Sequence, residues 1–360
     1  MKKILTVIAA AAVCAGASAQ MRLLVGTYTE GTSAEGVYLY SFDPASARTA
    51  LLDVAPSGNP SFVIADGTRA WSVNEFNDGR QAVSAYSIGP ESIRLIGTVP
   101  IPKADIDGED PCNILFTGSA VITSNYTGGT VTAFPVNADG SLGEMSQTYG
   151  ERSHFKAHMH CAVPSPDGKY LFVTNLGWDC IHRFYLKDGA QPLGPSTTAW
   201  QHIGLSKHYG PRHLIFSADG RFAYLLCELA DKLVVFSYSD GALTPIQTIT
   251  AYKGRGHGSA DLHLSPDGRF LYTSHRLKND GIAIFRVDPS SGKVKRAGYQ
   301  ETGIHPRNFA ISPDGRYLLC ACRDSNRIEV YSIDPSTGSL SLLEDRSISV
   351  GAPVCVQFVL

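Results

Sequence analysis

Charged side chains stand at corresponding places along this chain, where a repeated apolar pattern would otherwise carry turn residues. Glu75, Glu228, Arg276 and Arg323 each follow a glycine by eight residues. Carboxylate and imidazole groups can accept a proton, and guanidinium groups can bind an anion. Brought together, such groups would repel or desolvate one another unless an anionic ligand or a pairing network balanced them. As a set, they predict a binding or catalytic site.

A second polar group opens the segments that precede the glycines. Its members are His158, His160, Arg212, His213, Asp261, His263, Arg307 and Asn308. In a strand, alternation turns His158 and His160 to one face. Two imidazoles without an adjacent carboxylate are weak grounds for a metal site, so we predict no metal and no other cofactor. The alternative for any single member is structural, because strand-end His and Arg also cap backbone carbonyls or bridge neighbouring units.

The elements that must position these residues repeat along the chain. Turn glycines recur at intervals of 51, 50, 52, 48 and 47 residues, namely Gly67, Gly118, Gly168, Gly220, Gly268 and Gly315. The last four belong to the pattern Ser-Pro/Ala-Asp-Gly followed by Lys or Arg and an aromatic residue. A period of this length is typical of a repeat architecture.

Each unit contains four predicted antiparallel strands, for example residues 212–216, 222–226, 233–238 and 243–251. Such a unit is one blade of a β-propeller. The third-strand pattern occurs seven times, at residues 37–42, 83–88, 131–136, 181–186, 233–238, 282–287 and 328–333. Residues 21–28 form a second strand with no first strand before it, and residues 353–360 form a first strand with nothing after it. We therefore predict an all-β, seven-bladed propeller that closes by pairing the C-terminal strand with the N-terminal strands.

This architecture predicts where the polar set meets. The inner strands of a propeller line a central channel, so like positions from successive blades form a ring at one end. The unbroken repeat favours a single domain over residues 20–360. The net charge of −2 and the lack of a basic run argue against nucleic acid as a partner. A closed ring leaves few strand edges to share, so we expect a monomer.

The first 19 residues have the features of a secretory signal peptide. Lys2 and Lys3 precede an apolar run, and the small residues 17–19 precede Gln20. We expect export to the periplasm, with no membrane insertion after the signal is removed; a lipoprotein anchored through Cys14 is the alternative. Removal of the signal leaves seven cysteines, an odd number, and most lie in apolar strands, so we expect buried core thiols.

Several of these segments, in order and at blade spacing, resemble the seven-bladed propeller lactonase family, which includes the propeller type of 6-phosphogluconolactonase and is related to fungal carboxymuconate-lactonizing enzymes. The segments are Lys156-Ala157-His158-Met159-His160, Asn175-Leu176-Gly177-Trp178-Asp179, Gly210-Pro211-Arg212-His213, Ser259-Ala260-Asp261-Leu262-His263 and Pro306-Arg307-Asn308-Phe309. The resemblance covers residues from about 22 to 360. It implies a small-molecule lactone as substrate, of which an anionic sugar lactone is the expected class, and hydrolysis of the ester to the hydroxy acid.

The resemblance also implies the site residues. The family's site positions correspond to His160, Arg212, Glu228 and Arg276, which we assign as catalytic. We expect further substrate contacts from His158, Glu75, His213, Asp261, His275 and Arg307. Family members commonly carry Asn where this chain has Cys227 and His275.

Ester hydrolysis by an activated water then assigns the roles. Glu228 or His160 would be the general base, and Arg212 and Arg276 would stabilise the oxyanion and hold a substrate anion. The chain has no Gly-x-Ser-x-Gly turn, which argues against a serine nucleophile. Two alternatives remain open: a cycloisomerase or lyase of the muconate-lactonizing type, and a non-catalytic propeller that binds a partner.

Overall fold

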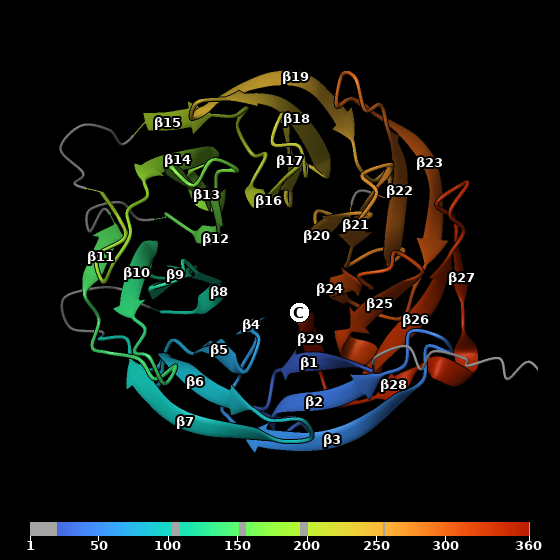
Figure 1. Cartoon of the computed structure of the whole chain (residues 1–360). Helices are drawn as coiled ribbons and strands as arrows, with labels where there is room; N and C mark the ends of the chain where they lie inside the picture. Colours follow the sequence, from blue (N-terminus) through green and yellow to red (C-terminus); the bar gives the residue numbers. More distant parts are fainter. Residues whose placement is uncertain (1–19, 103–108, 151–155, 195–200, 255, 360) are drawn as a thin grey trace, which may run out of the picture.

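The structure is a computed structural model that describes residues 20–102, 109–150, 156–194, 201–254 and 256–359. Seven antiparallel sheets stand around a central axis (Figure 1), which confirms the predicted seven-bladed β-propeller. The predicted signal peptide, including Cys14, lies outside the described residues. Among the described residues, no helix has both the length and the apolar character needed to cross a membrane.

Each blade runs from an innermost strand near the central axis to an outer strand at the rim (Figure 1). The innermost strands are β4 (Val63–Asp66), β8 (Pro111–Phe116), β12 (Met159–Pro164), β16 (Pro211–Phe216), β20 (Ser259–Leu264), β24 (Pro306–Ile311) and β29 (Pro353–Val359). The second strands are β1 (Met21–Thr27), β5 (Arg69–Asn74), β9 (Ala120–Asn125), β13 (Tyr170–Asn175), β17 (Phe222–Cys227), β21 (Phe270–His275) and β25 (Tyr317–Cys322).

The third and fourth strands complete the blades. The third strands are β2 (Gly36–Phe42), β6 (Ala82–Ile88), β10 (Thr130–Pro135), β14 (Cys180–Tyr185), β18 (Lys232–Ser239), β22 (Gly281–Val287) and β26 (Arg327–Ile333). The outer strands are β3 (Thr49–Pro56), β7 (Ile93–Pro100), β11 (Gln147–Gly150), β15 (Gln201–Gly204), β19 (Ala242–Thr250), β23 (Val294–Glu301) and the pair β27 (Leu340–Leu342) and β28 (Ile348–Ser349). Short 3-10 helices are η1 (Leu176–Trp178), η3 (Arg323–Ser325) and η4 (Glu344–Arg346), the last of which separates β27 from β28.

The ring closes as predicted, with β29 as the innermost strand of the blade that contains β1, β2 and β3. β29 pairs antiparallel with β1, so that Leu24 lies opposite Gln357 and Arg22 opposite Val359. Pairing the two ends of the chain gives both strands a hydrogen-bonding neighbour that each would otherwise lack.

The repeated Ser-Pro-Asp-Gly pattern makes the tight turn between the first and second strands. In the turn after β12, the Ser165 hydroxyl donates to Asp167 Oδ1 at 2.5 Å and accepts the Tyr170 backbone N–H at 3.0 Å. Gly168 takes a φ of 70°, a left-handed conformation that favours glycine. Ser217, Ser265 and Ser312 make the same pair of bonds. The repeat is therefore a hydrogen-bonding pattern as well as a sequence pattern.

The hydrophobic core lies between blades. One cluster packs Tyr224 and Val235 of one blade against Leu271 and Phe285 of the next. A second packs Phe42 and other side chains of the β1–β3 blade against the β24–β28 blade. Full burial of an aliphatic or aromatic side chain contributes about 1.5–3 kcal/mol, so contacts between blades stabilise the whole ring.

The seven cysteines described are all buried free thiols, as expected: Cys112, Cys161, Cys180, Cys227, Cys320, Cys322 and Cys355. Burial, the largest influence, raises the pKa of the Cys161 thiol to about 11, which keeps it protonated at neutral pH. Buried protonated thiols behave as small hydrophobic groups.

Candidate active site

A β-bulge near the start of several innermost strands leaves one residue of each strand without a partner on the second strand. In β8, Pro111 pairs with Asn125 and Asn113 pairs with Ser124, so Cys112 between them has no partner on β9. The same shift of register occurs in β12, β16 and β24. An extra residue in one strand re-aims the local side chains. The residues left unpaired are Cys112, His160, Arg212 and Arg307.

A second ring of side chains follows the second strands. The residues that follow each turn glycine by eight positions come directly after the last residue of β5, β9, β13, β17, β21 and β25. They are Glu75, Tyr126, Leu176, Glu228, Arg276 and Arg323. Tyr28 occupies the same position after β1. Sequence reasoning missed it because no turn glycine precedes β1, although its place after the first predicted strand was a usable signal.

Residues from both rings line one cavity of about 180 Å³. Its lining residues are Glu75, Cys112, Tyr126, His160, Glu228, Arg276 and Arg307. Three of the four predicted catalytic residues line this cavity. The fourth, Arg212, is almost fully buried beside Glu228 and is not part of the lining. Cys112 and Tyr126 are lining residues that sequence reasoning did not assign to the site.

Glu228 lies between two guanidinium groups. Arg276 Nη2 donates to Glu228 Oε1 at 2.9 Å, and Arg212 Nε lies 2.9 Å from Glu228 Oε2 without making a hydrogen bond. Arg212 Nη1 donates to the Ala260 carbonyl, and Arg276 Nε donates to the Gly258 carbonyl at 3.1 Å. Burial and the neighbouring Arg212 lower the pKa of Arg276 to about 9, so it stays protonated at neutral pH. Both carboxylate oxygens of Glu228 therefore face cations.

Arg307 and Glu75 form the other charged wall. Arg307 Nη2 lies 3.7 Å from Glu75 Oε2, and its guanidinium lies over the Tyr28 ring at 5.5 Å. Tyr28 donates its hydroxyl to Glu75 Oε1 at 2.8 Å, and Ser61 donates to Oε2. Among the described residues, Arg307 donates no hydrogen bond, which leaves its guanidinium able to bind an anion in the cavity.

His160 is the imidazole of the cavity. Burial and the cation of Arg212 hold the pKa of His160 well below its usual value, so the ring is neutral at neutral pH. Its Nδ1 is buried and has no hydrogen-bond partner among the described residues. Tyr126 contacts His160 edge to face at 5.7 Å between centroids, and stacks on His158 at 4.3 Å. His158 contacts the same tyrosine but does not line the cavity.

His213 and Asp261 bridge blades outside the cavity lining. His213 Nδ1 lies 2.7 Å from Asp261 Oδ1, and Asn308 donates to Asp261 Oδ2 at 2.6 Å. Asn308 Oδ1 then accepts the Val356 backbone N–H at 2.7 Å. We call His213, Asp261 and Asn308 the inner belt, because they connect β16, β20, β24 and β29 in turn. His213 and Asp261, which were expected to contact substrate, therefore have a structural role in connecting blades.

The Asp261 carboxylate of the inner belt is stabilised by the two histidines beside it. Burial alone would raise the pKa of Asp261, but His263, 3.0 Å from its Oδ2, and His213 lower it. Burial and Arg212 lower the pKa of His213 to about 4, so that ring is neutral at neutral pH. The Asp261 carboxylate thus has a hydrogen-bond donor for each oxygen.

His275 also lies away from the cavity. Its ring nitrogens lie 2.9 Å from Ser259 Oγ and 2.8 Å from Thr273 Oγ1, and its ring stacks on Tyr252. In another blade, Asn125 occupies the same position and accepts from Thr123 Oγ1 at 2.9 Å. His275 therefore takes the hydrogen-bonding place that asparagine has elsewhere. Of the six expected substrate contacts, only Glu75 and Arg307 line the cavity.

The cavity combines what hydrolysis of an ester requires. It brings a neutral imidazole, a carboxylate between two guanidinium groups and a further guanidinium to one enclosed space. A proton acceptor can activate water, and guanidinium groups can stabilise the negative charge that develops on the carbonyl oxygen. Among the described residues, no cluster of three or more His, Cys, Asp or Glu is placed to hold a metal ion.

Comparisons with known proteins agree with this chemistry. The family described as "Lactonase, 7-bladed beta-propeller" matches residues 22–358. A 6-phosphogluconolactonase of Bacillus subtilis is 33% identical, over 93% of this chain and 97% of the relative. A 6-phosphogluconolactonase of Formosa agariphila is 31% identical, over 93% of this chain and 99% of the relative. The solved structure of a periplasmic gluconolactonase of Pseudomonas aeruginosa is 34% identical, with a TM-score of 0.85 and coverage of 95% and 99%. The chain belongs to the seven-bladed β-propeller lactonase family.

Proposed function

We propose that this chain hydrolyses a sugar lactone to its hydroxy acid, in a reaction of the 6-phosphogluconolactonase type. Membership of the lactonase family supports a carboxylic ester hydrolase. The observation that carries the assignment is the convergence of His160, Glu228, Arg276 and Arg307 on one cavity of about 180 Å³. That volume lies below the usual range of about 300–1,000 Å³ for ligand pockets, so the cavity suits the reacting lactone group.

The geometry favours His160 over Glu228 as the general base. Both oxygens of Glu228 already face guanidinium groups, so the ion pairs with Arg212 and Arg276 occupy the carboxylate. His160 is held neutral, so its imidazole can take the proton of the attacking water. The water oxygen then forms a bond to the carbonyl carbon. Collapse of the tetrahedral intermediate breaks the bond between the carbonyl carbon and the ring oxygen, and that oxygen takes the proton back from His160 to become the hydroxyl of the product.

Arg276 and Arg307 are placed to stabilise the carbonyl oxygen as it becomes negative, because both line the cavity. Arg212 acts through Glu228, since it lies beside that carboxylate and outside the lining. Three guanidinium groups and two carboxylates, Glu75 and Glu228, leave the site with one net positive charge. That charge matches the single negative charge of the oxyanion.

We also propose that the chain is exported to the periplasm. Support for export comes from the basic and apolar pattern of residues 2–19 and from the similarity to the Pseudomonas aeruginosa periplasmic gluconolactonase. Export is tested by fractionating cells that produce the full chain. Mature protein in the periplasmic fraction that begins near residue 20 supports the proposal, and full-length protein in the cytoplasm contradicts it.

The activity is tested by pH-stat titration of acid release from a panel of lactones, with purified protein that lacks residues 1–19. We expect hydrolysis of gluconolactone or 6-phosphogluconolactone well above the spontaneous rate. Conversion of a muconolactone to its unsaturated acid, without hydrolysis of either sugar lactone, would instead identify a lyase. No reaction with any member would support a binding protein.

A further inference from the structure

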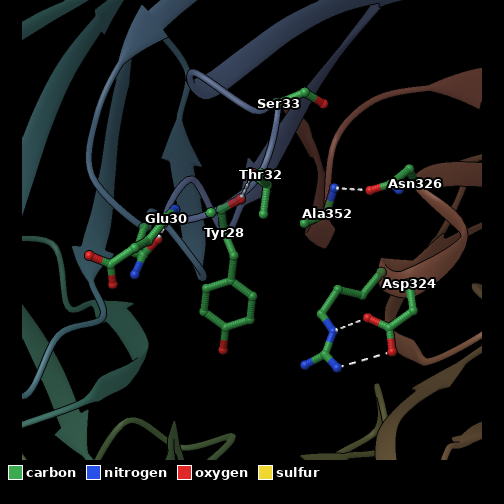
Figure 2. Close-up of a pocket in the computed structure, with 10 residues that line it drawn as sticks. Tyr28, Glu30, Thr32, Ser33, Asp324, Asn326 and Ala352 are labelled. Atoms are coloured by element: carbon green, nitrogen blue, oxygen red, sulfur yellow. Dashed lines mark hydrogen bonds and ion pairs between the residues drawn. The ribbon is translucent and has the colours of Figure 1, made fainter.

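A second, larger pocket lies beside the cavity at the same end of the channel. Its volume is about 660 Å³, within the range of ligand-binding pockets. The loop that follows β1 forms one wall, and the segment that follows β25 forms the opposite wall. Figure 2 shows Tyr28 and Asp324 on opposite sides of this pocket. We call it the Tyr28 pocket.

Two chains of contacts join the Tyr28 pocket to the cavity. On one side, Tyr28 lines the pocket and donates its hydroxyl to Glu75, which lines the cavity. On the other side, Arg276 Nη1 lies 3.3 Å from His305 Nε2, and His305 Nδ1 lies 3.4 Å from Asp324 Oδ2. The Tyr28–Glu75 pair therefore lies at the boundary between the two spaces, and a substrate that occupies both must pass beside it.

The charges of the Tyr28 pocket do not suit a phosphate. Arg323 is its single lining cation, and Asp324 holds both Arg323 Nε, at 2.6 Å, and Nη2, at 3.0 Å. Glu30 adds a second carboxylate, which accepts from Arg80 at 2.7 Å. The lining residues thus carry one net negative charge, which opposes an anionic ligand.

The remaining polar groups suit hydroxyl groups. The Ser33 hydroxyl makes no hydrogen bond among the described residues, and Asn326 uses its Oδ1 to accept the Ala352 N–H at 2.9 Å while its amide nitrogen stays available. Glu30 and Asp324 offer acceptors. Since each sugar hydroxyl both donates and accepts, a mixture of neutral donors and carboxylate acceptors matches a polyol.

We propose that the Tyr28 pocket binds an uncharged, hydroxyl-rich extension of the substrate, so that the preferred lactone carries a second sugar ring and no phosphate. This inference rests on the proposed lactonase function and adds the class of substrate. The cavity accepts the lactone ring, and the Tyr28 pocket accepts the attached sugar.

The test compares kcat/KM for three lactones: gluconolactone, 6-phosphogluconolactone and the disaccharide cellobionolactone. We expect cellobionolactone to exceed gluconolactone at least about tenfold, because the Tyr28 pocket would add two or three hydrogen bonds to the second sugar. 6-Phosphogluconolactone should rank below cellobionolactone. Equal values for cellobionolactone and gluconolactone, or the highest value for the phosphorylated lactone, overturn the inference while leaving the hydrolase assignment intact. No hydrolysis of any of the three overturns the proposed function itself.

Substitution then locates the effect. Ser33→Tyr places a ring in the Tyr28 pocket and should reduce the ratio of cellobionolactone to gluconolactone kcat/KM to near one. Ser206→Tyr is the matched control, since Ser206 is likewise exposed but lies on the loop between β15 and β16, outside both linings. It should keep the wild-type ratio. A Ser33→Tyr protein that melts at the wild-type temperature and keeps that ratio contradicts the placement.

Discussion

The cavity and the inner belt are both made of polar side chains on the innermost strands or directly after the second strands, yet they use their hydrogen-bonding capacity differently. In the belt, Asp261 receives hydrogen bonds on both oxygens, and Asn308 passes the network to the next blade. In the cavity, His160 Nδ1 has no partner among the described residues, and Arg307 contacts Glu75 only at 3.7 Å. The polar residues of the inner belt therefore connect neighbouring blades, whereas those of the cavity are available to a substrate.

This contrast divides the expected effects of substitution. Because the belt residues satisfy one another between blades, their loss should reduce stability more than catalysis. Because the cavity residues face a space for substrate, their loss should reduce catalysis more than stability. A belt variant that loses activity but keeps its stability, or a cavity variant that loses stability but keeps its activity, would contradict this division.

The largest effect is expected for His160→Gln. Loss of the general base should lower kcat for lactone hydrolysis about 10³-fold, within the range for general base catalysis, and leave the melting temperature near that of the wild type. In the wild type, activity should fall with acid only below pH 6.5, because the pKa of His160 is lowered and protonation removes the base. Stopped assays of kcat against pH measure both. An acid limb above pH 6.5, or a Gln variant of wild-type kcat, argues for another base.

The second effect concerns the belt. Asp261→Ala removes the shared acceptor of His213, His263 and Asn308 and leaves buried polar groups unpaired. We expect the free energy of unfolding to fall by about 3–5 kcal/mol, measured by urea titration. In protein that remains folded, kcat/KM should fall less than about tenfold. A stable Asp261→Ala protein with an activity loss as large as that of His160→Gln would place Asp261 in the reaction.

A smaller effect is expected from Glu228→Gln and Arg212→Ala, each at least about a hundredfold in kcat/KM. Both changes disturb the ion pairs that hold Arg276 at the cavity. Because Arg212 acts through Glu228, the double variant should lose little more than the larger single loss. Independent, multiplying losses in kcat/KM would show that Arg212 has a separate role.

The smallest effect is a pH dependence of stability at His275. Burial, the largest influence, and Arg296 lower the pKa of His275 to about 3, whereas an unfolded histidine titrates near about 6.5. Between these values the unfolded state binds the extra proton, so stability falls as the pH falls, by about 1.4 kcal/mol per pH unit. Urea titrations at pH 6 and pH 5 should show that the free energy of unfolding of His275→Asn falls less with acid than that of the wild type, by the contribution of this one histidine. An unchanged slope would contradict a buried neutral His275.

The sequence was sufficient to predict the fold because the repeat carries its own turn chemistry. The Ser-Pro-Asp-Gly turns, the alternating strands and the unmatched strand at each end predicted the blades and the closure. The same alignment brought out the end of the second strands, where Glu75, Glu228 and Arg276 do line the cavity.

The direction in which side chains point from the first strands was harder to predict. The bulges leave Cys112, His160 and Arg307 unpaired beside the cavity, while the next residue along, such as His213 after Arg212, points between blades. His213 and Asp261 were expected among the substrate contacts as members of the polar set at the start of the first strands, and the sequence does not show which members of that set a bulge turns away from the cavity. Tyr28 was missed because its blade is assembled from the two ends of the chain.

A crystal structure with the bound lactam analogue of gluconolactone, which keeps the ring and carbonyl but resists hydrolysis, would show directly whether the cavity is the active site. We predict that the carbonyl oxygen lies within hydrogen-bond distance of Arg276 or Arg307 and that the His160 imidazole faces the carbonyl carbon. Saturating analogue bound away from this cavity, with the cavity open and unoccupied, would contradict the assignment.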